Sequence, residues 1–176
     1  MDAKLLFLHA LSPLHAGTGQ GVGVIDLPIA REKATDIPIV PGSSLKGVLR
    51  DACTDTGDKI AVFGPETENA DAHAGSAHFT DARLLLLPVR SLAGTFAWVT
   101  SPLLLQRLRR DATHAASGSP PTSTPTPDGV GSCMVVQDDS AIVYSEQENT
   151  QVILEDLVLS AQPSAEAETW ANWLAC

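Results

Sequence analysis

The residue whose type and surroundings most suggest chemistry is Asp26. It is a lone carboxylate in the apolar stretch Val24-Ile25-Asp26-Leu27-Pro28, and the proline favours extended or turn geometry before it, so we expect Asp26 on a loop. A displayed carboxylate can accept a proton or hold a hydrated divalent ion. An Asx turn ahead of Pro28 is the simpler explanation, and these residues alone favour it.

His15 is the second candidate for acid-base chemistry, because an imidazole can shuttle protons near neutral pH. A lone histidine beside an apolar strand is more often structural, so both roles stay open. Arg31 and Lys33 follow Asp26 closely and are candidate phosphate contacts. Exposed loop charges are usually only solvated, so this assignment also has a simpler alternative.

Glycines alternate along the segment from Gly17 through Gly19 and Gly21 to Gly23. Without side chains, the backbone there can approach a ligand and offer its N–H groups, which makes the segment a candidate phosphate loop. Neither the dinucleotide fingerprint nor the Walker pattern is present, since the required third glycine and the Gly-Lys-Ser/Thr sequence are both missing. A flexible hairpin is the alternative.

A predicted helix from residue 43 to residue 52 provides a second candidate anion site. Ser43 or Ser44 is expected as the N-cap, and the N–H groups of the first turn can bind an anion. Lys46 and Arg50 lie four residues apart, beside an apolar stripe that we expect to be buried. Gly47 costs about 1 kcal/mol relative to alanine, which is easier to understand if a nucleic-acid backbone passes close by. A capped surface helix with two solvated cations is the alternative.

Hydrophobic patterns predict the elements that position these residues. The apolar runs and capping signals give strand, helix, strand, strand, helix, strand and a final short helix over residues 4–10, 43–52, 79–89, 95–100, 102–110, 152–159 and 166–174. The first six form the order βαββαβ, so the predicted fold class is α+β, a ferredoxin-like (RRM-like) palm with loop insertions.

The chain is 176 residues long and 44% hydrophobic, which predicts one domain over residues 1–176. Residues 117–128 contain four Pro, three Ser and three Thr, a composition that cannot hold a helix and predicts a flexible, exposed insertion. Three cysteines without Cys-x-x-Cys spacing favour a reducing cytoplasm over a disulfide framework or a zinc site. No run approaches the roughly 20 apolar residues of a membrane helix, so no membrane partner is expected.

Charge limits the kind of nucleic-acid site that is possible. The net charge is −10, which argues against coating nucleic acid by bulk charge. Residues 1–60 carry six basic and seven acidic side chains, whereas residues 61–176 carry five and fourteen, so the first third is the better place for an anion site. Eight aromatic residues without an aromatic ladder favour contacts to backbone and shape over base stacking.

Several blocks together resemble one family. The segment LHAGTGQGVGVIDLPIAREKATDIPIVPGSSLKGVLRDA, residues 14–52, and the segment DARLLLLPVRSLAGTFAWVTSP, residues 81–102, are similar to the RAMP superfamily of CRISPR effector proteins, and within it to the repeating backbone subunit of the type III-B complex. The resemblance continues through LEDL and the Trp-rich end. It does not include the family's C-terminal portion, so we expect the chain to lack the second half of the palm and part of the RNA-gripping thumb.

The resemblance implies an RNA-guided role. Such subunits stack as a filament along a guide RNA (crRNA), so the expected partners are guide RNA, target single-stranded RNA, other copies of the chain and other RAMP-type subunits. Each copy then needs to hold only a few phosphates, which a net negative subunit can do. The resemblance places the RNA-cleaving aspartate at Asp26, with Mg²⁺ or Mn²⁺ as the expected cofactor, and reverses the preference for an Asx turn.

Three hypotheses remain open from the sequence. The leading one is a metal-dependent endoribonuclease subunit that cuts target RNA at regular intervals, with Asp26 and His15 as catalytic candidates and Asp26 as the metal ligand. The second is a purely architectural guide-RNA-binding subunit. The third is a small-molecule enzyme that binds phosphate through the glycine loop. RNA-binding candidates in the first two are Gly17, Gly19, Arg31, Lys33, Ser43, Ser44, Lys46 and Arg50.

Overall fold

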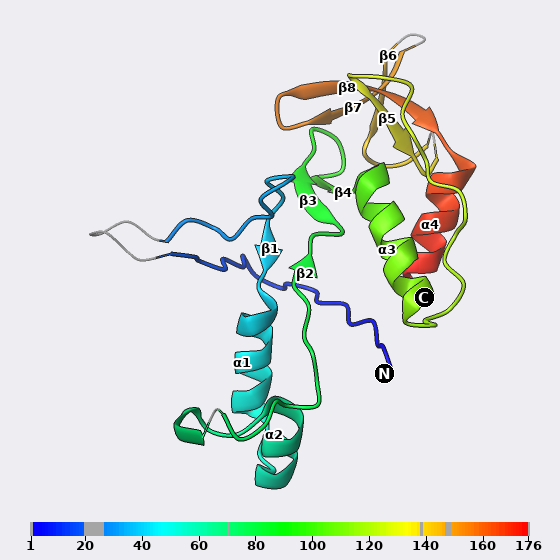
Figure 1. Ribbon diagram of the computed structural model, residues 1–176. Helices are drawn as coiled ribbons and strands as arrows, with labels where there is room; N and C mark the ends of the chain where they lie inside the picture. The colour runs from blue at the N-terminus through cyan, green and yellow to red at the C-terminus, as the bar shows by residue number, and fades with distance from the viewer. Residues whose placement is uncertain (1, 20–26, 70, 138, 147–148, 176) are drawn as a thin grey trace. The chain divides into compact units, whose positions relative to one another are not determined.

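The computed structural model describes residues 2–19, 27–69, 71–137, 139–146 and 149–175 (Figure 1). The chain divides into two compact units, one formed by Met1–Phe7 with Leu85–Cys176 and the other by Leu8–Leu84. The sequence predicted a single domain, and this stays a prediction because either unit could depend on the other for folding. Within the described ranges, no helix is long and apolar enough to cross a membrane.

The unit Leu8–Leu84 contains an antiparallel meander of short segments. Isolated bridges join Gly17 to Ile29 and Arg31 to Pro38. Strand β1, Ile39–Val40, then pairs with β2, Ala82–Arg83. Residues 15–18, 27–31, 37–40 and 82–83 therefore lie side by side in that order.

Helices follow the meander in the same unit. Helix α1 spans Gly42–Ala52, α2 spans Thr56–Phe63, and a 3-10 helix spans Thr67–Asn69. Asp55 caps α2 by accepting a hydrogen bond from the Asp58 N–H at 2.8 Å. Gly64 ends α2 with a φ of 94°, a conformation that favours glycine.

Helix α1 confirms the predicted helix but not its predicted cap or packing. Its N-cap is Pro41, without a side-chain hydrogen bond, because the helix starts at Gly42 and both serines already lie inside its first turn. The expected buried stripe is open, with Val48 71% and Leu49 39% exposed. Gly42 is the only buried residue of α1, and a methyl group there would lie 2.3 Å from the Phe79 carbonyl oxygen. Glycine at position 42 therefore permits the close passage of residues 79–80.

The unit formed by Met1–Phe7 and Leu85–Cys176 consists of strands with helices beside them (Figure 1). Strands β3, Leu87–Arg90, and β4, Phe96–Val99, form an antiparallel hairpin, and α3 spans Pro102–His114. A four-stranded sheet has the order β5-β8-β7-β6. Its strands are Ser132–Val135 (β5), Val143–Glu146 (β6), Asn149–Leu154 (β7) and Leu157–Pro163 (β8), and α4 spans Ala165–Ala175.

Two hydrophobic clusters hold this unit together. The first joins the β3–β4 hairpin to the four-stranded sheet through Ala97, Val135, Val152, Leu154 and Ala161. The second joins α3 to α4 through Leu105, Leu108 and Trp170, of which Trp170 is 2% exposed. Burial of a Val or Leu side chain contributes about 1.5–3 kcal/mol, so these two clusters are an important source of the unit's stability.

Three predicted strands are wrong. Residues 4–10 form no strand, and Leu6 and Leu8 are 66% and 51% exposed, because no described segment pairs with this apolar run. The predicted strand 79–89 is two strands, β2 and β3, which pair with different partners. The predicted strand 152–159 is a hairpin in which β7 turns into β8 at Glu155, whose φ is 52°.

Other predicted elements are confirmed. Strand β4 lies within residues 95–100 after a turn at Gly94, whose φ is 70°. Helix α3 has Ser101 as its N-cap and Pro102 in its first turn, as predicted, and runs four residues further than expected, to His114. Helix α4 contains the predicted residues 166–174.

Residues 117–128 contain neither helix nor strand, in agreement with their composition. Part of the segment nevertheless lies against α3 and α4. The Trp170 Nε1–H donates to the Ser123 carbonyl at 2.8 Å, and the Arg109 guanidinium donates to the Thr122 carbonyl. Flexibility of the whole segment stays a prediction, since these two contacts involve only residues 122–123.

The fold class is α+β, as predicted, and the sheets are small, but the ferredoxin-like βαββαβ arrangement is not confirmed. The missing first strand, the split of residues 79–89 and the extra strands of residues 132–163 account for the difference in element order.

Candidate nucleic-acid interface

Residues 15–18 and 27–30, which flank the glycine-rich segment in the sequence, form a short antiparallel stem. The Thr18 N–H donates to the Pro28 carbonyl at 2.9 Å, and the Ala30 N–H donates to the Ala16 carbonyl at 2.7 Å. A methyl group on Gly17 would lie 2.8 Å from Leu27 Cβ, so the two sides of the stem approach closely only because residue 17 is glycine. Asp26 itself, with Gly21 and Gly23, lies outside the described residues. The stem brings the two ends of the segment 19–27 together.

His15 contacts the strand that follows Asp26. Its Nε2 atom lies 2.7 Å from the Leu27 carbonyl oxygen, on the exposed surface. A carbonyl oxygen only accepts, so Nε2 carries the proton and, in the neutral imidazole, Nδ1 keeps its lone pair. His15 and Leu27 thus contact each other across the stem, and the Nδ1 atom of His15 is able to accept a proton.

Arg31 and Lys33 lie at a tight turn beyond the stem. The Asp36 N–H donates to the Glu32 carbonyl, the Glu32 N–H donates to the Ile37 carbonyl, both at 2.9 Å, and Asp36 has a φ of 59°. Arg31 Nη1 donates to the Asp36 carbonyl at 2.7 Å, so its guanidinium already closes the turn. Lys33 is exposed and forms no ion pair with any residue that the structure describes.

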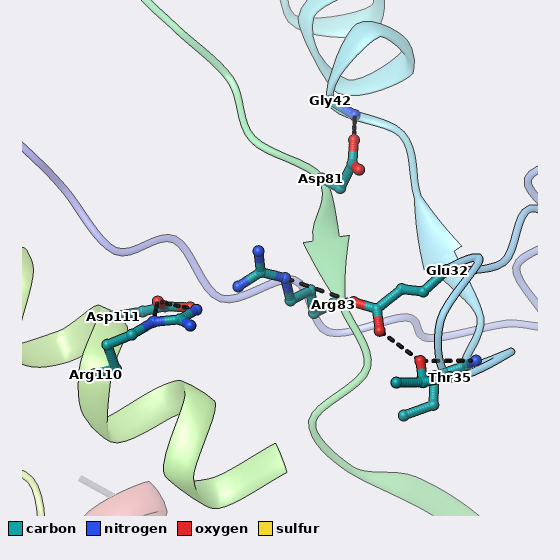
Figure 2. A network of polar contacts seen from close by, with 8 residues as sticks. Glu32, Thr35, Gly42, Asp81, Arg83, Arg110 and Asp111 are labelled. Atoms are coloured by element: carbon teal, nitrogen blue, oxygen red, sulfur yellow. Dashed lines mark hydrogen bonds and ion pairs between the residues drawn. The ribbon is translucent and has the colours of Figure 1, made fainter. Parts of the chain in front are cut away.

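Glu32 holds this turn in place, a role that the sequence did not predict. Figure 2 shows its carboxylate between Thr35 and Arg83: Thr35 Oγ1 donates to Oε2 at 2.5 Å, and Arg83 Nε lies 3.7 Å from Oε1. Thr35 Oγ1 also accepts from the Ile37 N–H at 3.3 Å. The alternating charges Arg31-Glu32-Lys33 were the available signal, but the pairing with Arg83 depends on β2 lying beside β1.

The start of α1 already has a carboxylate bound to it. Gly42 N–H donates to Asp81 Oδ1 at 2.8 Å, across 39 positions of the chain (Figure 2). The N–H groups of Ser44 and Leu45 donate to the Pro41 carbonyl, while the Ser43 and Ser44 side chains are exposed. Asp81 stabilises the positive end of the helix dipole. It also reduces the attraction of that end for a phosphate.

The two cations of α1 differ in their partners. Arg50 Nη2 lies 3.2 Å from Glu66 Oε1, an ion pair whose angles do not make a hydrogen bond, so this buried Nη2 lacks an acceptor among the described residues. Lys46 is half-buried and has no acidic partner in the described ranges. Next to it, a methyl group on Gly47 would meet no atom within 4 Å. Lys46 and Gly47 thus have room beside them in the described structure, and RNA binding there stays a prediction.

The described residues contain no group of three or more His, Cys, Asp or Glu side chains that could hold a metal ion. Asp26 lies outside them. Mg²⁺ is often held by one or two carboxylates while waters and substrate phosphates complete its shell, and this arrangement needs no such group. Burial raises the pKa of the Cys133 thiol, which keeps it protonated and a weak nucleophile.

Comparison with known proteins identifies relatives of this chain. The model of the RAMP superfamily matches residues 7–161. The chain is 47% identical over 116 residues to the CRISPR system Cmr endoribonuclease Cmr4 of Pyrococcus furiosus, which covers 63% of this chain and 39% of that protein. Oligomeric Cmr4 from Pyrococcus furiosus matches with a TM-score of 0.68 at 32% identity, over 93% of this chain and 58% of that one.

A more distant structure shares the fold alone. The type III-B Cmr-beta complex bound to cognate target RNA contains a chain that matches with a TM-score of 0.60 at 18% identity, over 87% of this chain and 56% of that one. The chain spans less than two thirds of the length of each of these relatives. Since the superfamily model matches most of its residues, the chain belongs to the RAMP superfamily.

Proposed function

We propose that this chain is a backbone subunit of an RNA-guided type III-B CRISPR effector complex, which holds guide RNA and cleaves complementary target single-stranded RNA at regular intervals. The observation that carries the proposal is the 47% identity with the Cmr endoribonuclease over 116 residues. Its proposed partners are the two RNAs, further copies of the chain and other RAMP-type subunits. The ferredoxin-like palm is part of the same proposal.

The proposed site combines positioning and proton transfer. Lys46, with Gly47 beside it, holds a phosphate of the RNA, and Lys33 adds a second cation at the turn that Glu32 fixes. Three other candidates contribute less because each already has a partner. Arg31 donates to the Asp36 carbonyl, and Arg50 pairs with Glu66. In the first turn of α1, the Gly42 N–H donates to Asp81. Gly17 and Gly19 form the side of the stem that faces residues 27–29 and carry the loop.

Cleavage requires one proton to leave and one to arrive. As the 2′-oxygen bonds to phosphorus, Asp26 accepts the 2′-OH proton, and the bond from phosphorus to the 5′-oxygen breaks. The leaving 5′-oxygen takes up one proton, which a protonated His15 imidazole donates from Nδ1 while its Nε2–H stays bonded to the Leu27 carbonyl. The products are a 2′,3′-cyclic phosphate and a free 5′-hydroxyl.

A divalent ion belongs to the proposal as well. The oxygen donor of Asp26 suits Mg²⁺ or Mn²⁺, and such an ion would supply charge stabilisation at the crowded phosphate.

The substitution Asp26→Asn tests the catalytic role. It keeps the side-chain volume but removes the charge, so we expect cleavage of target RNA to fall about a hundredfold or more, while guide and target binding stay near wild type. Cleavage is measured on labelled target in the assembled complex, with EDTA and with added Mg²⁺ or Mn²⁺. Full cleavage by Asp26→Asn would contradict the role, and binding without cleavage by the wild type would mean an architectural subunit.

A further inference from the structure

The outer face of the β3–β4 hairpin carries two aromatic rings that the proposed site does not use. Phe96 and Trp98 are 45% and 50% exposed, and their centroids lie 5.7 Å apart with the rings at 85° to one another. Two half-exposed aromatic rings side by side offer flat apolar surface on which a ligand can stack.

Register places two further residues on the same face. Pro88 pairs with Trp98 and Arg90 pairs with Phe96, and all four side chains are exposed. The alternate residues Val89 and Ala97 point the other way and join the core cluster. We call Pro88, Arg90, Phe96 and Trp98 the Phe96–Trp98 face. Because Val89 and Ala97 pack into the core on the opposite side, the paired strands hold the two rings in fixed positions.

Charge on this face suits an anionic ligand with flat groups. None of its four residues is acidic, although the chain as a whole carries a net charge of −10. Arg90 forms no ion pair with the described residues, while Glu155 lines the same hollow of about 240 Å³ as Arg90. The aromatic rings, rather than the single arginine, must therefore supply most of the affinity.

The size of the face distinguishes a nucleobase from a protein partner as its ligand. A four-residue strand spans about 13 Å and neighbouring strands lie about 4.8 Å apart, so the face covers on the order of 100 Å². A stable protein interface buries about 800 Å² on each partner, far more than this face provides. One or two nucleobases match it, because a base stacks on an aromatic ring and its phosphate can contact an arginine.

We propose that the Phe96–Trp98 face is a stacking platform for unpaired bases of single-stranded RNA. The proposal rests on the RNA-binding part of the proposed function and adds base contacts to the phosphate contacts near Lys46. It revises the expectation that base stacking is unimportant, which was drawn from the number of aromatic residues and not from where the fold exposes them.

The test compares the full chain with the double variant Phe96→Leu/Trp98→Leu. Leucine keeps an apolar side chain but has no ring, so it preserves hydrophobic docking and removes stacking. Binding of a fluorescein-labelled uridine 12-mer and of an abasic oligomer of equal length and charge is followed by anisotropy. We expect the variant to bind the uridine 12-mer about tenfold more weakly for each ring lost, and the abasic oligomer unchanged. Leu157→Ala, a change at a 59% exposed residue of β8, is the control and should alter neither.

Each result has one meaning. Equal affinity of wild type and double variant for the uridine 12-mer would overturn the platform and leave the proposed function intact. The same holds if the double variant loses only self-association, measured by sedimentation, since the face would then bind a second copy. Failure of the wild type to bind the uridine 12-mer at concentrations at which it binds a longer single-stranded RNA would overturn the platform alone, and failure to bind the longer RNA as well would contradict RNA binding. Circular dichroism melting verifies that the variant is folded.

Discussion

Lys46 and Arg50 lie on neighbouring turns of α1, and their partners decide what each can bind. A guanidinium paired with Glu66 must lose that partner before it contacts a phosphate, whereas the ammonium of Lys46 has no such cost within the described structure. The sequence put both residues forward equally. Glu66 is 16 positions beyond Arg50, and nothing in its neighbourhood signals the pairing.

Substitution of Lys46 tests this difference. We expect Lys46→Ala to weaken binding of every RNA sequence and to lower the slope of log K against log salt by about one, because one phosphate contact is lost. Arg50→Ala should change the slope less. Lys59→Ala on α2 removes the same charge elsewhere in the unit and serves as control. An unchanged slope for Lys46→Ala, measured in the assembled complex, would remove Lys46 from the site.

At the scale of an element, Ser164 caps the start of α4, and measurements of stability can test this role. Its Oγ accepts from the Ala167 N–H at 3.3 Å and donates to Glu166 Oε2 at 2.9 Å. Hydrogen bonds from the Glu166 backbone N–H and from Ser164 lower the pKa of Glu166 below its ordinary value of 4.5. The cap and the charged side chain therefore support the helix together.

Ser164→Ala should lower the free energy of unfolding by about 1 kcal/mol at neutral pH, the usual cost of losing an N-cap. The deficit should shrink as the pH falls below 4.5, because a lowered folded pKa contributes stability that is lost once the carboxylate is protonated in both states. Urea unfolding at pH 7 and pH 3 measures both. Thr169→Ala, at an exposed position of the same helix, is the control and should stay within about 0.5 kcal/mol. A Ser164→Ala deficit that does not change with pH would exclude Glu166 from the cap.

Local signals predicted some elements and failed for others. Ser101-Pro102 identified the start of α3, since a cap and a first-turn proline act on adjacent residues. The β7–β8 hairpin was missed because its turn, at Glu155 and Asp156, lacks the Asn or Gly that usually marks one. The Asp81 bond to Gly42 depends on tertiary packing, so no local pattern contains it. For the candidate site, residue type alone was enough to propose His15, whereas the role of Glu32 depends on the position of Arg83.

At the scale of the whole molecule, the net charge of −10 conflicts with binding a polyanion. Local sites resolve the conflict only if several copies share one RNA, because each then adds its few contacts to the same strand. The described cations are consistent with this, since most of those near the stem already have acidic or carbonyl partners.

Binding should therefore depend on RNA length. We expect an RNA long enough for several copies to bind cooperatively and at higher salt than an RNA that accommodates one copy, which should bind weakly. Sedimentation of the chain with single-stranded RNAs of increasing length measures stoichiometry and affinity together. Affinity that is independent of length would show that each copy binds alone.

The parallel pairing of β5 with β8 has a consequence for the order of folding. Strand β5, residues 132–135, pairs with β8, residues 157–163, from which β6 and β7 separate it in the chain. The pairs β6–β7 and β7–β8, in contrast, join strands that are consecutive in the sequence. Pairing across a long loop costs closure entropy before it is rewarded, so β5 should dock after the transition state has formed. Val135, 5% exposed, reports on this step: Val135→Ala should accelerate unfolding and leave the refolding rate nearly unchanged in a chevron analysis. Equal effects on both rates would show that β5 is already docked in the transition state. If only unfolding is accelerated, β5 is the edge strand of this sheet that separates first when the unit unfolds.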